Sequence, residues 1–137
     1  MTPRVTTTSS ADLLTWAEEV LHARTGVLAG CWARAVAILG RQALEALLCE
    51  LWAARSLSLD GCSTRAQLLC LRAYLDDPDL AAEIDHTWSA LSNACHHHPY
   101  ELAPTSQELA RWLEAVRKAQ QQLAIGSPAA RRLTEPR

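Results

Sequence analysis

The chain has 137 residues, of which 49% are hydrophobic and 20% are charged, and its formal net charge is −2 at pH 7. These values are typical of one globular domain and exclude a disordered chain, and a domain of this size buries enough surface to fold without a metal or a disulfide. The near-neutral charge also excludes the broad basic surface of proteins that bind long duplex nucleic acid non-specifically, but it leaves room for a local RNA or anion site.

The N-terminal part of the chain predicts a disordered stretch followed by a helix. Residues 1–9 are rich in Thr and Ser, and we expect them to be disordered. Ser10 is predicted as the N-cap of a first helix, whose apolar face includes Leu13 and Leu21. Gly26 is expected to close this helix, because glycine readily adopts the left-handed conformation that follows a helix end.

The segment from Val27 to about Arg55 is predicted as the longest helix. Its apolar residues lie almost all the way round, which is typical of the central helix of a bundle. Arg34, Arg41 and Glu45 are exceptions, and at the helical repeat they fall within about 40° of one another in a narrow polar stripe. Arg41 and Glu45 also have the spacing of an ion pair on one helix. Such a pair commonly serves packing between helices, with ligand binding as the alternative.

Two further helices are predicted in the middle of the chain. Ser63 is expected to cap a third helix that ends near the sequence DDPD, and its apolar residues are Leu68, Leu69, Leu71 and Leu75. Either Asp79 or the preceding Asp77-Pro78 pair is expected to start a fourth helix, whose apolar residues recur every three or four positions: Leu80, Ile84, Trp88, Leu91 and Cys95. Pro99 disfavours a helical residue before it, so the fourth helix should end at about His96 or His97.

The last predicted helix begins at a capping box. Thr105 and Glu108 have the T-x-x-E spacing of that motif, and the helix directs a set of apolar residues inward: Leu109, Trp112, Leu113, Val116 and Leu123. Residues 125–137 are polar and contain proline, so we expect a disordered tail. The sequence therefore predicts an all-α fold, a single-domain bundle of about five helices over residues 10–124.

The cysteines and the N-terminus predict the compartment. The chain has five cysteines, an odd number without C-x-x-C spacing: Cys31, Cys49, Cys62, Cys70 and Cys95. Most stand among apolar residues, which predicts buried free thiols and a reducing compartment. The N-terminus lacks the apolar run of a signal peptide, and no uncharged apolar stretch of about 18 residues could span a membrane. We expect a cytoplasmic protein without membrane contact.

The stretch SNACHHHPYELAPT, residues 92–105, is the least ordinary part of the sequence. Its three consecutive histidines suggest a metal site, but neighbouring helix positions point about 100° apart, so Cys95 and His96 are poorly placed to share one ion. A structural zinc site also needs a second pair of ligands, which the sequence does not offer. We therefore expect no metal and no other cofactor, and Cys95, within an apolar stripe, is a poor nucleophile.

A catalytic interpretation of His96 starts from helix geometry. His96 falls within about 60° of three polar residues on the predicted fourth helix: Asp85, Ser89 and Ser92. A histidine held near a carboxylate can act as a general base at neutral pH. The simpler interpretation is a histidine at a helix C-terminus, where its positive charge suits the helix dipole.

The order of these elements resembles the HEPN superfamily over roughly residues 11–124. The resemblance rests on a long second helix with the sequence GRQALE, and on a late helix that ends in a histidine motif before a loop and a final helix. It implies metal-independent RNases that act as homodimers, with a motif of Arg, four to six residues and His, which continues as His-x-Tyr in one toxin branch. His98-Pro99-Tyr100 matches the His-x-Tyr part.

The arginine of that motif is missing. Asn93 stands in its place before His98, and no arginine precedes His96 or His97 at the permitted spacing. Because Asn lacks the fixed positive charge that Arg offers to a phosphate, the resemblance implies a module with weak catalysis or none, unless Arg41 supplies the charge in space.

Two functions follow from these observations, and the sequence leaves open whether the chain is an enzyme. The first is an RNA-associated or toxin/defence module, in which a histidine would activate the 2′-hydroxyl and a tyrosine would bind phosphate or orient the base. Its candidate catalytic residues are Asn93, His96, His98 and Tyr100, and its candidate ligand-binding residues are Arg41, Glu45 and His97. The alternative is a small helical dimerisation or scaffold protein without a chemical active site, in which the histidines do not converge on a pocket.

Overall fold

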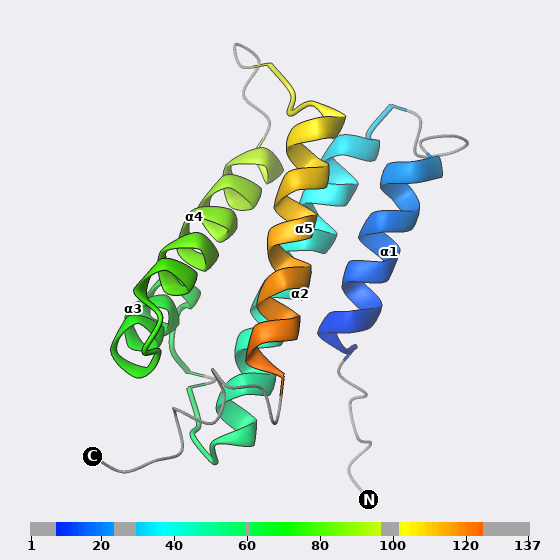
Figure 1. Ribbon diagram of the computed structural model, residues 1–137. Coiled ribbons are helices and arrows are strands. Elements are labelled where there is room, and N and C mark those ends of the chain that lie inside the picture. The colour runs from blue at the N-terminus through cyan, green and yellow to red at the C-terminus, as the bar shows by residue number, and fades with distance from the viewer. Residues whose placement is uncertain (1–7, 24–29, 60, 97–101, 125–137) are drawn as a thin grey trace, which may run out of the picture.

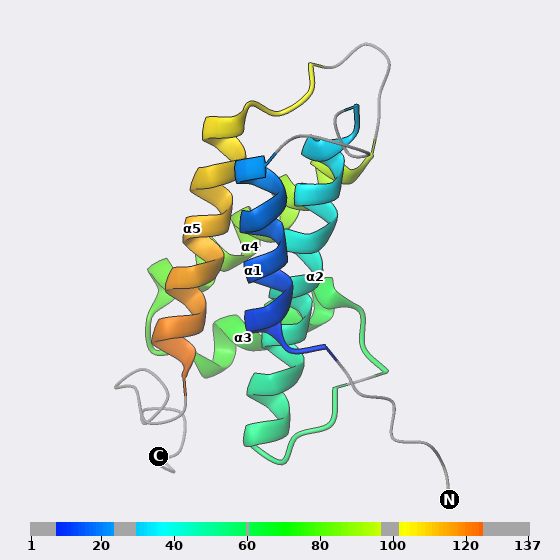
Figure 2. The ribbon, with the colours of Figure 1, turned by 90° about the vertical axis from the view of Figure 1, so that its right-hand side faces the viewer.

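The computed structural model describes residues 8–23, 30–59, 61–96 and 102–124, and within these segments the chain forms five α-helices and no strand. The helices are α1 (Ser10–Ala23), α2 (Trp32–Ala54), α3 (Thr64–Tyr74), α4 (Pro78–Cys95) and α5 (Ser106–Leu123). The helices α1, α2, α4 and α5 alternate in direction along the bundle, and the short α3 packs against α4 (Figures 1 and 2). The all-α prediction is confirmed, whereas most of both predicted disordered termini and the predicted closure at Gly26 lie outside the described residues.

The start of α1 depends on a residue of α2. Ser9, not Ser10, is the N-cap, because its hydroxyl accepts a hydrogen bond from the N–H of Asp12 at 3.2 Å. Ser10 is buried, and its N–H and hydroxyl donate to the carboxylate of Glu50 at 2.9 and 2.6 Å. A carboxylate satisfies free N–H groups at a helix N-terminus and interacts favourably with the helix dipole. The prediction of Ser10 as N-cap is therefore wrong by one residue.

The other helix starts agree with the predicted caps. The side chain of Ser63 accepts from the N–H of Ala66 at the start of α3, and Asp77 caps α4 with Pro78 in the first turn. Thr105 and Glu108 form the predicted capping box of α5. The helix α2 begins at Trp32, later than predicted, since Gly30 and Cys31 form a turn.

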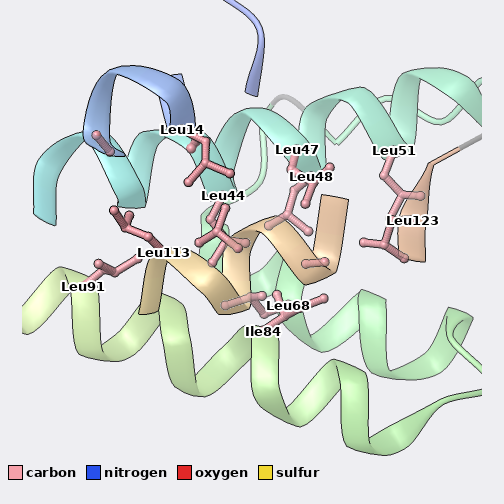
Figure 3. Packing of buried hydrophobic residues seen from close by; sticks show 14 of the residues in the cluster. Leu14, Leu44, Leu47, Leu48, Leu51, Leu68, Ile84, Leu91, Leu113 and Leu123 are labelled. Atoms are coloured by element: carbon pink, nitrogen blue, oxygen red, sulfur yellow. The ribbon is translucent and has the colours of Figure 1, made fainter. Parts of the chain in front are cut away.

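The core lies between α2 and the helices around it (Figure 3). Leucines of α2 meet apolar side chains from all four other helices, and the largest fully buried ones include Leu14, Leu44, Leu48, Leu91 and Leu113. Gly40 allows this close packing, because a Cβ there would lie 2.9 Å from Cδ2 of Leu113 and 3.3 Å from Cδ2 of Leu91. The N-terminal half of α2 is thereby held against α4 and α5 near the end of the bundle where α4 stops.

Two ion pairs join α5 to neighbouring helices. Arg117 makes a bidentate contact with Glu18 of α1, with Nε–Oε1 at 3.0 Å and a terminal nitrogen 2.6 Å from Oε2. Lys118 donates to Glu83 of α4 at 2.9 Å. These hydrogen bonds raise the pKa of Arg117 and the pKa of Lys118 above their ordinary values.

Leu69 of α3 is 62% exposed, because α3 is covered on one side only. Burial differs from the prediction at two places. Cys31, Cys49 and Cys62 are exposed, and Cys95 alone among the five cysteines is buried. The helix α2 is not covered all round, since part of its apolar surface is half-buried or exposed. As for the membrane, the described helices include none with the length and apolar character needed to cross one.

Candidate functional site

A pocket of about 570 Å³ opens at the end of the bundle where α2 starts and α4 stops, the upper end in Figure 1. Its walls come from the first turn of α2, the last two turns of α4, residues 102–105 and the first two turns of α5. We call this cavity the loop-end pocket. His96, the first of the three consecutive histidines, lines this pocket, and the other two histidines lie outside the described residues.

The loop-end pocket exists because the residues that face it are small. Ala33 of α2 and both Ala90 and Ala94 of α4 line it, and an alanine leaves space that a larger side chain would fill. Trp112 of α5 and Pro104 add an apolar wall with a large aromatic surface. An alanine-lined hollow beside an indole suits a flat ring, because aromatic groups stack favourably in offset arrangements.

Polar side chains complete the pocket, among them Arg34 from α2, and Asn93 and His96 from α4. His96 is the C-cap of α4, and its N–H donates to the carbonyl of Asn93 at 3.2 Å. The predicted helix end is thus confirmed, and the side chain of His96 is exposed beside a helix C-terminus, where a positive charge is favoured. Glu108, which also lines the pocket, accepts a hydrogen bond from the hydroxyl of Thr105 at 3.1 Å within the capping box.

The structure brings together some of the predicted site residues and separates others. Asn93 and His96 line the same pocket. His97, His98 and Tyr100 lie outside the described residues. The two residues predicted on α2, Arg41 and Glu45, are not part of the pocket lining and lie between α2 and α4.

The contact region between α2 and α4 uses its polar groups for packing. Oε1 of Glu45 accepts a hydrogen bond from Nε1 of Trp88 at 3.2 Å and lies 3.7 Å from Nε of Arg41, beyond hydrogen-bond distance. The predicted Arg41–Glu45 ion pair is therefore present in a loose form. Among the described residues, Nε of Arg41 and the hydroxyl of Ser92 are buried without a hydrogen-bond partner. We call this region the α2–α4 seam.

Cys95 lies against the same seam and is not an activated nucleophile. Burial raises the pKa of its thiol above the ordinary value, and the positive charges of Arg41 and Arg34 only partly oppose this effect. A thiol with a raised pKa is protonated at neutral pH and reacts slowly. The expectation that Cys95 is a poor nucleophile agrees with this environment.

The proposed contact between Asp85 and His96 is not formed. Asp85 lies 3.3 Å from a terminal nitrogen of Arg72 on α3. It precedes His96 by three turns of α4, a rise of about 16 Å, which is too far for a hydrogen bond between the two side chains. The shared helix face was a correct observation, but distance along the axis separates the two groups.

Sequence reasoning missed Arg34 and Trp112 as site residues. Arg34 was assigned only to the polar stripe of the second helix, and Trp112 only to the core. Trp112 also lines a second hollow of about 380 Å³ between α4 and α5, with His86, Arg111 and Lys118 among its other lining residues. The signal for Arg34 was its place at the start of the helix, but the antiparallel packing that brings it to Asn93 is not visible in the sequence.

No metal centre is evident in the segments that the structure describes, because none of their His, Cys, Asp and Glu side chains gather in groups of three or more that could hold an ion. No protein-family model matches the chain, and no curated protein or solved structure is significantly similar to it. The chemistry of the loop-end pocket must therefore be inferred from its own residues.

Proposed function

We propose that the chain is a HEPN-like helical module of a toxin or defence system, which binds RNA at the loop-end pocket and cleaves it weakly or not at all. The observation that supports this function is that Arg34 lines the same pocket as Asn93 and His96. The guanidinium group of α2 adds a positive charge beside the residue that replaces the arginine of the family motif. Arg34 therefore takes the role that the sequence suggested for Arg41.

Three polar residues of the pocket have a counterpart in RNA chemistry: Arg34, Asn93 and His96. A guanidinium group binds phosphate oxygens through two parallel hydrogen bonds. The amide of Asn93 can donate to and accept from a base edge or a ribose 2′-hydroxyl, and the ring nitrogens of His96 can donate to or accept from the same groups. Unpaired bases stack on aromatic side chains such as Trp112. Together these groups favour single-stranded RNA over a duplex, whose bases are already stacked.

Weak cleavage follows from how Arg34 is held. Its side chain is exposed and comes from a different helix than the histidine stretch, so its charge is not fixed in one position. Transition-state stabilisation requires charges that are already in place when the reaction occurs. An exposed guanidinium group without a hydrogen-bond partner among the described residues binds phosphate but stabilises the transition state poorly.

RNA binding by the full chain tests the proposal. Fluorescence anisotropy with a short labelled single-stranded RNA should show binding, and Arg34→Ala should weaken it about tenfold, the loss of roughly one charge-assisted hydrogen bond. Arg65→Ala is the matched control, because Arg65 is an exposed arginine of α3 and does not line the pocket. An RNA affinity that is equal in the two variants would contradict this role of Arg34.

A cleavage assay tests the second part of the proposal. Purified protein incubated with RNA in EDTA should give little or no product. Robust cleavage that His98→Ala abolishes would show an active RNase and would refute the weakly active form of the proposal.

A second candidate function is that of a dimerisation module, and the outer face of α2 favours it. Five uncharged residues of this face fall within about 80° of one another and are half-buried or exposed: Ala35, Ile38, Gln42, Ala46 and Cys49. An apolar helix face of this kind can pack against the same face of a second copy. We therefore propose a homodimer, in the cytoplasm, where the exposed free thiols of this chain would remain reduced.

Light scattering of the purified protein tests the dimer. Ala46→Glu places a charge in the centre of the outer face and should give a monomer, because an unpaired buried charge is costly. Ala82→Glu, at an exposed position of α4, is the control and should leave the dimer intact. A wild-type monomer, or a dimer that persists in Ala46→Glu, would exclude this interface. A dimer that binds no RNA would support dimerisation as the function and would contradict RNA binding.

A further inference from the structure

Trp112 lies between two hollows. It lines the loop-end pocket on one side and the second hollow, between α4 and α5, on the other. The second hollow has a volume of about 380 Å³, and its lining from α4 includes Glu83, His86 and Thr87. An indole with open space on two sides is a suitable platform for a planar ring.

The two hollows follow each other along the same pair of helices. On α4, Glu83 and His86 of the second hollow precede Ala90 and Asn93 of the loop-end pocket. The opposite order holds on α5, because the two helices are antiparallel (Figure 1). On α5 the residues that line the two hollows extend from Glu108 to Gln121, which is a rise of about 20 Å along the helix. The two hollows share Trp112 and follow each other along α4 and α5, and we call the surface that they make up the α4–α5 groove. Its extent along α5 matches several consecutive nucleotides.

Two arginines of this groove have no ion-pair partner in the part of the chain that the structure describes. Arg34 belongs to the loop-end pocket and Arg111 to the second hollow, and neither lies within ion-pair distance of a described carboxylate. Three carboxylates also line the groove: Glu83 binds Lys118 at 2.9 Å, Glu108 is held in the capping box, and Glu114 forms no salt bridge with a described residue. One available guanidinium group thus lies in each hollow, with Trp112 between them.

We propose that one RNA strand lies along the α4–α5 groove, with a base stacked on Trp112 and phosphates bound by Arg34 and Arg111. This inference rests on the proposed RNA-binding function and extends it from a single pocket to a path for a single strand. A platform of one aromatic residue between two cationic residues is the arrangement that binds single strands with little dependence on base identity. An acidic peptide would also meet two arginines, but its backbone does not present the planar rings that the indole and the alanine-lined hollow accommodate.

A length series tests the path. Full-length protein is titrated with an oligouridine dinucleotide and hexanucleotide, and the hexanucleotide should bind about tenfold more tightly because it reaches Arg111 and Trp112. Arg111→Ala should remove this gain and leave dinucleotide affinity unchanged. For hexanucleotide binding by Arg111→Ala, the slope of log affinity against log salt concentration should also be smaller in magnitude by about 0.7, the value for one phosphate contact on a single strand. Arg65→Ala should match the wild type in all three measurements.

Tryptophan fluorescence tests the stacking. Binding of the hexanucleotide should quench part of the emission of wild-type protein. The Trp112→Phe variant should lose that quenching, because the emission of its four remaining tryptophans should not change on binding. Thermal unfolding by circular dichroism identifies a Trp112→Phe protein that is misfolded. In that case Trp112→Tyr, which keeps more of the ring volume, replaces it and should also lose the quenching.

The outcomes separate this inference from the proposed function. RNA binding that depends on Arg34 but not on Arg111, with equal affinity for both lengths, would refute the path and leave the RNA pocket in place. Retained quenching in the folded Trp112 variant would refute the stacking. A poly-glutamate peptide that binds this groove in preference to RNA would show a protein partner. An absence of any RNA binding would overturn both the path and the proposed function.

Discussion

The two sides of α4 differ in how their polar groups are used. On the side toward α2 and α3, Asp85 binds Arg72, and Trp88 donates its indole N–H to Glu45. On the side toward α5, small residues leave a hollow, and the side chains of Asn93 and His96 form no hydrogen bond within the described segments. Asp85 and Trp88 have partners in the protein, although Nε of Arg41 and the hydroxyl of Ser92 in the α2–α4 seam have none. Asn93 and His96, which line the hollow, have capacity for a ligand.

The largest expected effect on the free energy of unfolding comes from the buried side of α4. Leu91→Ala removes a fully buried side chain that contacts the backbone of α2 near Gly40. We expect the free energy of unfolding to fall by about 3 kcal/mol, because the neighbouring helices cannot fully close the cavity. Urea denaturation followed by circular dichroism measures this change. A loss below about 1 kcal/mol would show that this side is less tightly packed than the buried area of Leu91 indicates.

The α2–α4 seam should show a smaller effect. Glu45→Ala removes the acceptor for the indole N–H of Trp88 and the charge beside Arg41, so we expect a loss of about 1–2 kcal/mol in the free energy of unfolding. Glu45→Gln is the control, because its amide oxygen still accepts from Trp88, and it should lose about half as much. Equal losses in the two variants would assign the effect to the charge instead of the hydrogen bond. Neither variant should change RNA affinity if the seam is only structural.

Local patterns predicted most of the fold. The caps at Ser63, Asp77 and Thr105 form between residues three apart, so their signals lie within one turn of sequence. The start of α1 was misplaced for the opposite reason. Ser9 and Ser10 are equally good caps as isolated residues, and the choice is made by Glu50, which lies forty positions away in the sequence.

The site was harder to predict, because it depends on the register between helices. Arg34 and Arg41 are two turns apart on the same stripe of α2, and nothing in their local sequence distinguishes them. The packing of α2 against α4 and α5 at Gly40 determines which arginine reaches the end of α4, and Arg34 does so. The exposure of Leu69 depends on packing in the same way, since its sequence does not reveal that α3 is covered on one side only.

The thiol of Cys95 offers a pH-dependent test of the packed side. Burial raises the pKa of this thiol in the folded protein, so above about pH 8 the unfolded chain loses this proton more readily than the folded chain does. The folded state then binds more protons, and the free energy of unfolding should fall as pH rises, by less than about 1.4 kcal/mol per pH unit. Cys95→Ala should show a shallower slope in denaturation series between about pH 8 and pH 10. An unchanged slope would indicate that Cys95 is accessible to water.

The smallest expected effect on stability comes from the position next to Leu91, and it tests the contrast between the two sides of α4 most directly. Ala90→Leu points a larger side chain into the loop-end pocket, where the space is empty, so we expect a change within about 0.5 kcal/mol in the free energy of unfolding. The same substitution should fill part of the pocket and weaken RNA binding at least tenfold, because a ligand and the leucine side chain compete for one volume. Ala82→Leu, at an exposed position of α4 outside the pocket, is the matched control and should change neither quantity.

If Ala90→Leu destabilises the fold as strongly as Leu91→Ala, the hollow is closed in solution. If it leaves RNA affinity unchanged, RNA binds elsewhere, because a ligand in the loop-end pocket would have to compete with the leucine side chain for the same volume.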